Sequence, residues 1–198
     1  MWTVPDAWSY SYLLGMYLGD GWVGPTSRAI RISFSLDLAY PEIIEETVTA
    51  VWLAALGARV TVRPHPHDRY AVVNSYARHW GAAFPQTGAG PKHLRPIVLA
   101  DWQREIVDRH PEQFLRGLIH SDGCRTINRF KTKLPSGRVA EYAYPRYFFS
   151  NLSADIRGLF GEYCERLGVR WTQSNHRNIS VSHRRSVAIL DRFIGPKT

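Results

Sequence analysis

The sequence lacks several features that would place it in a specialised class of protein. It holds two cysteines among 198 residues, Cys124 and Cys164, without CxxC spacing. We therefore predict neither a disulfide framework nor a thiolate zinc site. The longest apolar stretches, such as those within 48–58, are interrupted well short of the roughly 20 residues needed to span a bilayer. Residues 1–6 lack a basic start followed by an apolar segment, so a cytoplasmic, intracellular protein is expected.

Acidic residues are also scarce relative to basic ones. The sequence has 25 Lys and Arg against 17 Asp and Glu, a formal net charge of +8. Residues 1–100 hold 8 basic and 7 acidic residues (+1), whereas residues 101–198 hold 17 and 10 (+7). Neutralising phosphates releases condensed counterions, so a basic protein is suited to a polyanion, although charge also serves solubility. A duplex ligand would be held unequally by the two halves.

Four segments of the first half recur in the same order in the second half. The pairs are LLGMYLGDG (13–21) and LRGLIHSDG (115–123), RISFS (31–35) and RYFFS (146–150), LGARVTV (56–62) and LGVRWTQ (167–173), and GPK (90–92) and GPK (195–197). Their offsets of 102, 115, 111 and 105 residues fit two copies of one unit after changes in loop length. We predict an N-terminal unit, 1–98, and a C-terminal unit, 99–198, divided by the Gly- and Pro-containing segment 86–91 or just beyond it.

Hydrophobic periodicity predicts the same α-β-β-α-β-β-α plan in each unit, and therefore an α+β fold. For the first unit we expect helices over 7–19, from Pro41 to about 56 and from Ser75, and strands near 22–28 and over 30–37, 60–63 and 69–74. For the second we expect a connecting helix over 97–109, the motif helix, a hairpin over 124–150 turning at 135–137, a helix over 153–167, and strands over 169–174 and 177–182.

The two repeated apolar helices each end in Asp-Gly and carry small residues four apart on one face. These are Gly15 and Gly19 in the first helix, and Gly117 and Ser121 in the second. Small residues permit close backbone contact, so parallel packing would place Asp20 beside Asp122. Carboxylates at a helix C-terminus are disfavoured by about 0.3–1 kcal/mol each, and two together repel. A divalent cation would reverse this, whereas an Asp-Gly ending that only turns the chain is the alternative for either copy alone.

LLGMYLGDG and LRGLIHSDG resemble the two motifs of single-chain LAGLIDADG homing endonucleases, and the likeness covers nearly the whole chain. The resemblance implies two pseudo-twofold-related units whose antiparallel sheets form a DNA-binding saddle, with the motif helices at their interface. It implies a monomeric endonuclease that hydrolyses one phosphodiester in each strand of a long, asymmetric duplex site, leaving 3′ overhangs. Its cofactor would be Mg²⁺ or Mn²⁺, and Ca²⁺ would support binding without cleavage.

The same resemblance implies roles for residues at the motif positions. The metal-holding acids are Asp20 and Asp122, with the main-chain carbonyls of Gly19 and Ser121 facing the metals. The sixth motif position, often acidic in the family, is Leu18 in one copy and His120 in the other, so neither copy has a second acid there.

Family active sites also carry a basic residue in each half, near the cleaved phosphates. The GPK repeat makes Lys92 and Lys197 the candidates for this catalytic role, the alternative being solvated loop lysines. The family's further polar residue has two possible positions, Asp37 and Asn151, and is assigned to neither.

Polar side chains alternate with apolar ones along the predicted strands, and their face of the sheet is expected to contact DNA. The candidates are Arg31, Ser33, Ser35, Arg59, Thr61, Arg63, Arg146, Ser150, Arg170 and Thr172. The strongest basic stripe is Arg125, Arg129, Lys131 and Lys133, on one side of the long hairpin. Arginine can contact guanine and lysine can neutralise phosphate, whereas the alternative is an edge strand charged against aggregation.

Some LAGLIDADG proteins have lost cleavage and act as DNA-binding regulators or as maturases that help introns splice. The presence of both motif acids favours the enzyme. A regulator usually carries an additional helix-turn-helix segment, for which the predicted elements leave little room.

Overall fold

The computed structural model describes residues 3–194 and 197, and it shows the same series of elements twice. The first copy comprises α1 (Ala7–Gly19), β1 (Gly21–Pro25), β2 (Ile30–Asp37), α2 (Pro41–Ala54), β3 (Val60–Pro64), β4 (Tyr70–Ala77) and α3 (Trp80–Ala83). A connecting segment contains the 3-10 helix η1 (Lys92–Leu94) and α4 (Asp101–Arg109). The second copy comprises α5 (Pro111–Asp122), β5 (Gly123–Lys133), β6 (Val139–Ser150), α6 (Ala154–Arg166), β7 (Thr172–Gln173), β8 (Asn178–Val181) and α7 (Arg184–Asp191).

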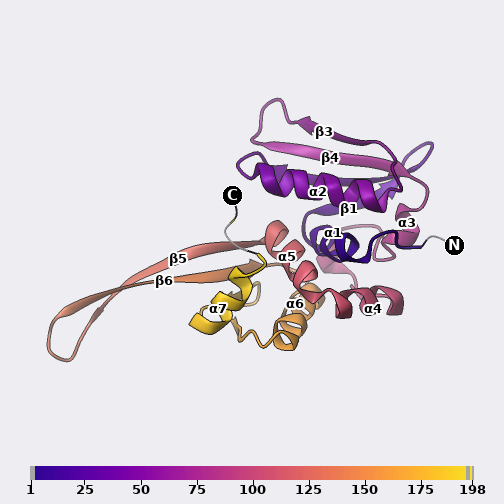
Figure 1. Cartoon of the computed structure of the whole chain (residues 1–198). Helices are drawn as coiled ribbons and strands as arrows, with labels where there is room; N and C mark the ends of the chain where they lie inside the picture. The colour runs from indigo at the N-terminus through magenta and orange to yellow at the C-terminus, as the bar shows by residue number, and fades with distance from the viewer. Residues whose placement is uncertain (1–2, 195–196, 198) are drawn as a thin grey trace.

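Each copy builds a four-stranded antiparallel sheet with the same strand order. The orders are β1-β2-β4-β3 and β5-β6-β8-β7, which confirms the α+β fold predicted from the repeat. Gly21 pairs with Phe34 in the first sheet, and Gly123 pairs with Phe149 in the second. Gly123 follows Gly21 by 102 residues and Phe149 follows Phe34 by 115, the offsets of the repeated segments. The two copies therefore also share the register of these paired strands. Helices α1 and α2 lie against one side of the first sheet (Figure 1).

Local sequence signals explain where the helices begin. Asp6 precedes α1, and its carboxylate accepts a hydrogen bond from the Ser9 amide at 2.7 Å. Ser153 caps α6 in the same way through the Ile156 amide, while Pro41 occupies the first turn of α2. These residues satisfy or remove amide donors that a helix start leaves without a partner.

Helices α1 and α5 pack in parallel at the centre of the molecule, with their backbones in close contact. Residues 9–18 of α1 are buried around the whole helix, as expected of a helix that is apolar on every side. A Cβ atom on Gly15 would lie 2.8 Å from the Leu118 amide nitrogen and 3.0 Å from the Gly117 Cα. A Cβ atom on Gly19 would collide with Ser121. The small residues four apart therefore meet in register, which confirms the predicted parallel packing.

Several predicted boundaries were wrong. Ser75 does not begin a helix: it is buried in β4, which continues to Ala77 because that residue pairs with Ile30 of β2. The connecting helix begins at Asp101 rather than 97, since the amide of Ile97 donates instead to Asp155 of α6 at 2.8 Å. Helix α2 ends at Ala54, and β7 and β8 are shorter than the predicted strands.

No helix in the described part of the chain has the length and apolar character needed to cross a membrane. Of the second GPK segment, residues 195 and 196 lie outside the described residues, whereas Lys197 is described.

Candidate functional site

The two motif acids meet at the same end of the α1–α5 pair. Asp20 is the C-cap of α1, and Asp122 is the last residue of α5. A Cβ atom on Gly19 would lie 3.1 Å from the Asp122 carboxyl carbon, so the second acid lies directly against the first motif. Removal from water, followed by repulsion from Asp122, raises the pKa of Asp20 to about 6. Burial also raises the pKa of Asp122, against the opposing effect of a hydrogen bond from Asn151.

Lys92 is anchored on the backbone that carries the first acid. Its Nζ donates to the main-chain carbonyls of Tyr17, Gly19 at 2.7 Å and Gly21 at 2.8 Å. An ammonium group at this position satisfies orphan carbonyls and complements the negative end of α1. Burial lowers the pKa of Lys92 to about 8, although Asp122 and Asp20 favour its charged form.

Lys197 occupies the equivalent position in the second copy. Its Nζ donates to the Ser121 carbonyl at 3.4 Å and lies 5.6 Å from the centre of the Tyr40 ring. Each lysine of the GPK repeat therefore contacts the carbonyl that precedes a motif Asp. These are also the carbonyls that the resemblance assigned to the metals, and a carbonyl oxygen has two lone pairs with which to accept more than one partner.

Asn151 connects the second acid to the start of α6. Its side-chain amide donates to Asp122 Oδ2, while its own Oδ1 accepts from the Ser153 amide at 2.7 Å. Of the two positions left open by the sequence, Asn151 thus contacts a motif acid. Asp37 accepts from the Ala39 amide at 2.9 Å and favours the charged form of Lys197. The register places Leu36, a buried core residue, at the position of Asn151 in the first copy.

His120, at the sixth motif position, belongs to an interior polar cluster. Its Nδ1 lies 3.1 Å from the Tyr12 hydroxyl and 3.6 Å from Glu46, which Arg116 contacts through two hydrogen bonds of 2.7 and 2.8 Å. Burial, followed by the nearby Arg116 charge, lowers the pKa of His120 to about 3. The imidazole is therefore neutral at physiological pH.

The acids fit a cation that needs few protein ligands. Among the residues that the structure describes, no group of three or more His, Cys, Asp or Glu could hold a metal ion. Two carboxylates with raised pKa values and nearby main-chain carbonyls are nevertheless a hard-oxygen donor set. Mg²⁺ is commonly held by one or two carboxylates together with water and substrate phosphate.

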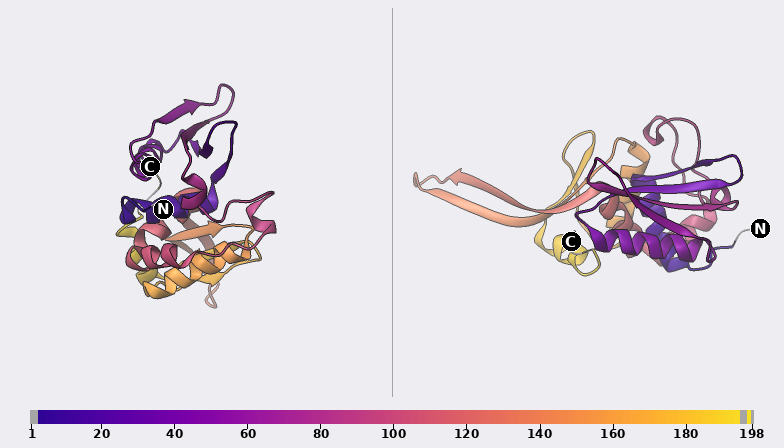
Figure 2. Two further views of the ribbon diagram at one scale, coloured as in Figure 1. Left: turned by 90° about the vertical axis from the view of Figure 1, so that its right-hand side faces the viewer. Right: turned by 90° about the horizontal axis from the view of Figure 1, so that it is seen from above.

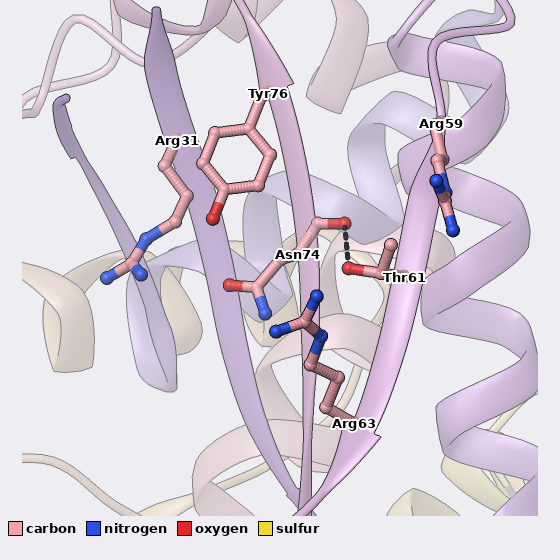
Figure 3. Close-up of a pocket in the computed structure, with 6 residues that line it drawn as sticks. All are labelled: Arg31, Arg59, Thr61, Arg63, Asn74 and Tyr76. Atoms are coloured by element: carbon pink, nitrogen blue, oxygen red, sulfur yellow. Dashed lines mark hydrogen bonds between the residues drawn. The ribbon is translucent and has the colours of Figure 1, made fainter. Parts of the chain in front are cut away.

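The outer face of the first sheet forms a basic groove of about 390 Å³. Its lining residues come from β2, β4 and the β3 region (Figure 3): Arg31, Arg59, Thr61, Arg63, Asn74 and Tyr76. Ser33 and Ser35 alternate with the buried Ile32 and Phe34 and lie on the same face as Arg31. Three guanidinium groups and no carboxylate line the groove, so it is suited to an anionic ligand.

Sequence reasoning missed Asn74 and Tyr76 on this face. Tyr76 pairs with Arg31, and Asn74 pairs with both Ser33 and Thr61. The available signal was strand alternation: once the neighbouring strands are aligned, residues opposite Arg31 and Ser33 must share their face. Trp22 was missed as well, and the Arg31 guanidinium lies 4.8 Å from the centre of its ring.

The outer face of the second sheet carries the expected polar residues in a different setting. Arg146 lies 4.0 Å above the Phe148 ring and donates to Ser180 Oγ at 2.7 Å. Thr172 pairs with Ser180, so it shares this face, and Ser150 is exposed at the end of β6. Arg170 is exposed and precedes β7.

The basic stripe of β5 lies on the other face of its hairpin. Arg125 forms a bidentate ion pair with Asp191 of α7, at 2.7 and 2.9 Å, and is paired across the strands with the buried Tyr147. Arg129, Lys131 and Lys133 follow at every second residue and share the side of Arg125. The structure therefore does not place this stripe on the face of Arg146. The reason is register, because Gly123 begins β5 opposite Phe149, whose side chain enters the core.

No protein-family model and no curated protein matches this sequence. Solved structures do share its architecture. The chain resembles I-DmoI in complex with DNA and Mn, with a TM-score of 0.56 at 12% identity, over 97% of this chain and 99% of that one. The LAGLIDADG meganuclease I-AabMI bound to uncleaved DNA gives 0.57 at 9% identity, over 95% and 84%. The chain has the fold of the LAGLIDADG homing endonucleases.

A further structure with this fold is not named as an endonuclease. Full-length DUF199/WhiA from Thermatoga maritima resembles the chain with a TM-score of 0.61 at 15% identity, over 96% of this chain. The chain spans 56% of the length of that protein. Since all these identities are low, the likeness establishes the fold, and function has to be argued from the site.

Proposed function

We propose that the protein is a monomeric, metal-dependent DNA endonuclease that hydrolyses one phosphodiester in each strand of a long, asymmetric duplex site and leaves 3′ overhangs. The observation that carries this proposal is the meeting of Asp20 and Asp122 at one end of α1 and α5, each preceded by a carbonyl that accepts from a lysine. Two units, 1–98 and 99–198, would each provide one acid, one lysine and one sheet.

Asp20 and Asp122, with the carbonyls of Gly19 and Ser121, would hold Mg²⁺ or Mn²⁺. When bound, such an ion supplies a Lewis acid and lowers the pKa of water. Ca²⁺ would support binding without cleavage. Lys92 and Lys197 lower the pKa values of the two acids, but burial keeps both values raised. A bound cation would therefore stabilise the charged carboxylates further.

The remaining residues of the site would position and stabilise. Asn151 fixes the orientation of Asp122 through its side-chain amide. Lys92 and Lys197 would stabilise negative charge that accumulates on the phosphate during attack, which is the role of a pre-positioned cation in a phosphoryl-transfer site. Their catalytic role depends on releasing or sharing the carbonyls that they now contact.

The partner would be double-stranded DNA, contacted by the outer faces of the two sheets. Arg31, Arg59 and Arg63 line the first groove, and Arg146 lies on the second sheet. The other outer-face candidates are Ser33, Ser35, Thr61, Ser150, Arg170 and Thr172. That I-DmoI and I-AabMI were both solved with DNA supports this choice of partner. An asymmetric site follows because the two faces carry different side chains.

The test is to incubate the protein with a randomised duplex library, in Mg²⁺ and separately in EDTA, and to sequence the resulting ends. Metal-dependent ends that share a long motif are the expected result. Asp20→Asn and Asp122→Asn should abolish cutting and spare binding, and Asp101→Asn provides a matched control at an exposed carboxylate in the first turn of α4. Full cutting by both acid variants would overturn the assignment. Enrichment of duplexes without ends would indicate a cleavage-inactive regulator, and preferential binding of intron RNA a maturase.

A further inference from the structure

The β5–β6 hairpin extends far beyond the sheet to which it belongs (Figures 1 and 2). Strand β5 has 11 residues where β1 has 5, a difference of six. Strand β8 pairs with β6 over 147–150 of β6, so the rest of the hairpin is a two-stranded ribbon with no third strand from the described part of the chain. At about 3.3 Å per residue, six extra residues extend the second copy by roughly 20 Å relative to the first.

One face of this ribbon carries an exposed aromatic cluster. Phe130 stacks on Tyr142 with ring centres 5.2 Å apart and meets Tyr144 edge-on at 5.7 Å. The three side chains are 39%, 44% and 37% exposed. Strand alternation places the cluster on the face of Arg146, and it therefore continues the outer face of the second sheet. Clustered exposed aromatic rings typically mark an interaction surface.

The ribbon also concentrates the positive charge of the protein. Residues 123–150 hold six basic residues and one acidic residue, a net charge of +5, whereas the first hairpin, 21–37, holds two and one, a net charge of +1. Arg129, Lys131 and Lys133 lie on the face opposite the aromatic cluster, and Lys131 forms an ion pair with Glu141. A partner that fits both faces combines apolar surface with flanking negative charge. The major groove of DNA has this chemistry, with thymine methyl groups on its floor and phosphates on both sides.

We propose that the longer hairpin lengthens the DNA arm contacted by the second unit, and that Phe130, Tyr142 and Tyr144 contact base edges and thymine methyls in the major groove of that arm. This inference rests on the proposed DNA partner. The major groove is about 12 Å wide and admits a two-stranded ribbon. At about 3.4 Å per base pair, the extra 20 Å adds roughly six base pairs to this arm. The protein therefore contacts a longer arm on the side of its second unit.

The first experiment is hydroxyl-radical footprinting of the full-length protein on a selected duplex in EDTA, where no cutting interferes. Protection should extend about six base pairs further on one arm than on the other. A variant in which residues 128–144 are replaced by a two-residue Asn-Gly turn should lose the additional protection on that arm alone. Equal arms with the native hairpin, or a footprint unchanged by the shortened one, would overturn the inference.

The second experiment uses full-length protein and single side chains, so it does not depend on the shortened variant folding. Replacing a thymine of the longer arm by uracil removes one methyl group, which should weaken binding about three- to fourfold if the methyl is buried against the ring. Phe130→Ser and Tyr142→Ser should abolish this discrimination between thymine and uracil. Lys131→Gln, on the opposite face, should preserve the discrimination and reduce the salt dependence of binding.

The outcomes separate the two proposals. If no duplex is bound by the native protein, the proposed function fails. If duplex is bound and the aromatic variants discriminate thymine from uracil as the native protein does, the hairpin inference fails while the proposed function stands.

Discussion

Replacing Asp20 by Asn should make the metal-free protein more stable at slightly alkaline pH, although it removes a residue of the proposed catalytic site. Burial of the Asp20 carboxylate, followed by repulsion from Asp122, raises its pKa from 3.8 to about 6. The folded protein therefore binds this proton more tightly than the unfolded chain does. The stabilising contribution is complete below about pH 4 and is lost as the pH rises through 6.

The magnitude follows from the size of the shift. A difference of about two pK units corresponds to about 3 kcal/mol between the two protonation states. Because Asp20 is exposed to solvent on one side, screening reduces this to an expected difference of about 1–2 kcal/mol at pH 8. The amide of Asn cannot ionise, so Asp20→Asn should gain this stability at pH 8 and none at pH 4.

The assay is urea denaturation in EDTA at pH 4, 6 and 8, comparing the native protein with Asp20→Asn. Asp101→Asn is the control, because Asp101 is an exposed carboxylate in the first turn of α4 and is not part of the site. A stability difference that does not change with pH, or an Asp20→Asn variant less stable than the native protein at pH 8, would refute the electrostatic account. Saturating Mg²⁺ should reverse the order by stabilising the native protein more than the variant.

Three further substitutions test the packing and charge around the site. Gly15→Ala should lower the free energy of unfolding, measured by thermal denaturation, by about 1–3 kcal/mol, because the added methyl would push α1 away from α5. Its control is Gly158→Ala on α6, where the methyl meets open space and the free energy of unfolding should rise by up to about 1 kcal/mol. Arg116→Met should lower the free energy of unfolding in urea by about 2–3 kcal/mol, because it leaves the half-buried Glu46 without this ion-pair partner. Its control is Arg104→Met, at a more exposed ion pair, which should lower the free energy of unfolding by less than about 1 kcal/mol. Lys92→Met should raise the pKa of the first motif acid above about 6 in an NMR titration, since the Lys92 charge lowers it.

The repeat in the sequence predicted most of the architecture, because spacing and register are properties that sequence patterns carry directly. Gly15 and Gly117 could be identified as contact residues since only glycine allows the observed approach. Lys92 and Lys197 could be paired from three repeated letters, and the structure places each against the carbonyl before a motif Asp. These positions depend on backbone geometry, which the two copies share.

The parts that sequence could not predict depend on which face a strand presents or on where it stops. The alternation in β5 correctly placed Arg125 and Lys131 on the same face. Which side of the ribbon this face occupies follows only from the pairing of Gly123 with the core residue Phe149. An error of one residue in register exchanges the two faces of a ribbon completely. Ser75 reads as a helix start by composition, and tertiary pairing with β2 keeps it in a strand.

The two copies share their order of elements and differ in the side chains around the two acids. Asn151 holds Asp122 in place, and the position that corresponds to it in the first copy is the buried Leu36. Among the described residues, Lys92 donates to three carbonyls, whereas Lys197 donates to one at a longer distance. A symmetric pair of acids needs only the shared helix geometry, so the side chains around each acid are free to diverge once both units occur in one chain. These unequal surroundings agree with the proposed asymmetric DNA site, whose two halves would meet different side chains.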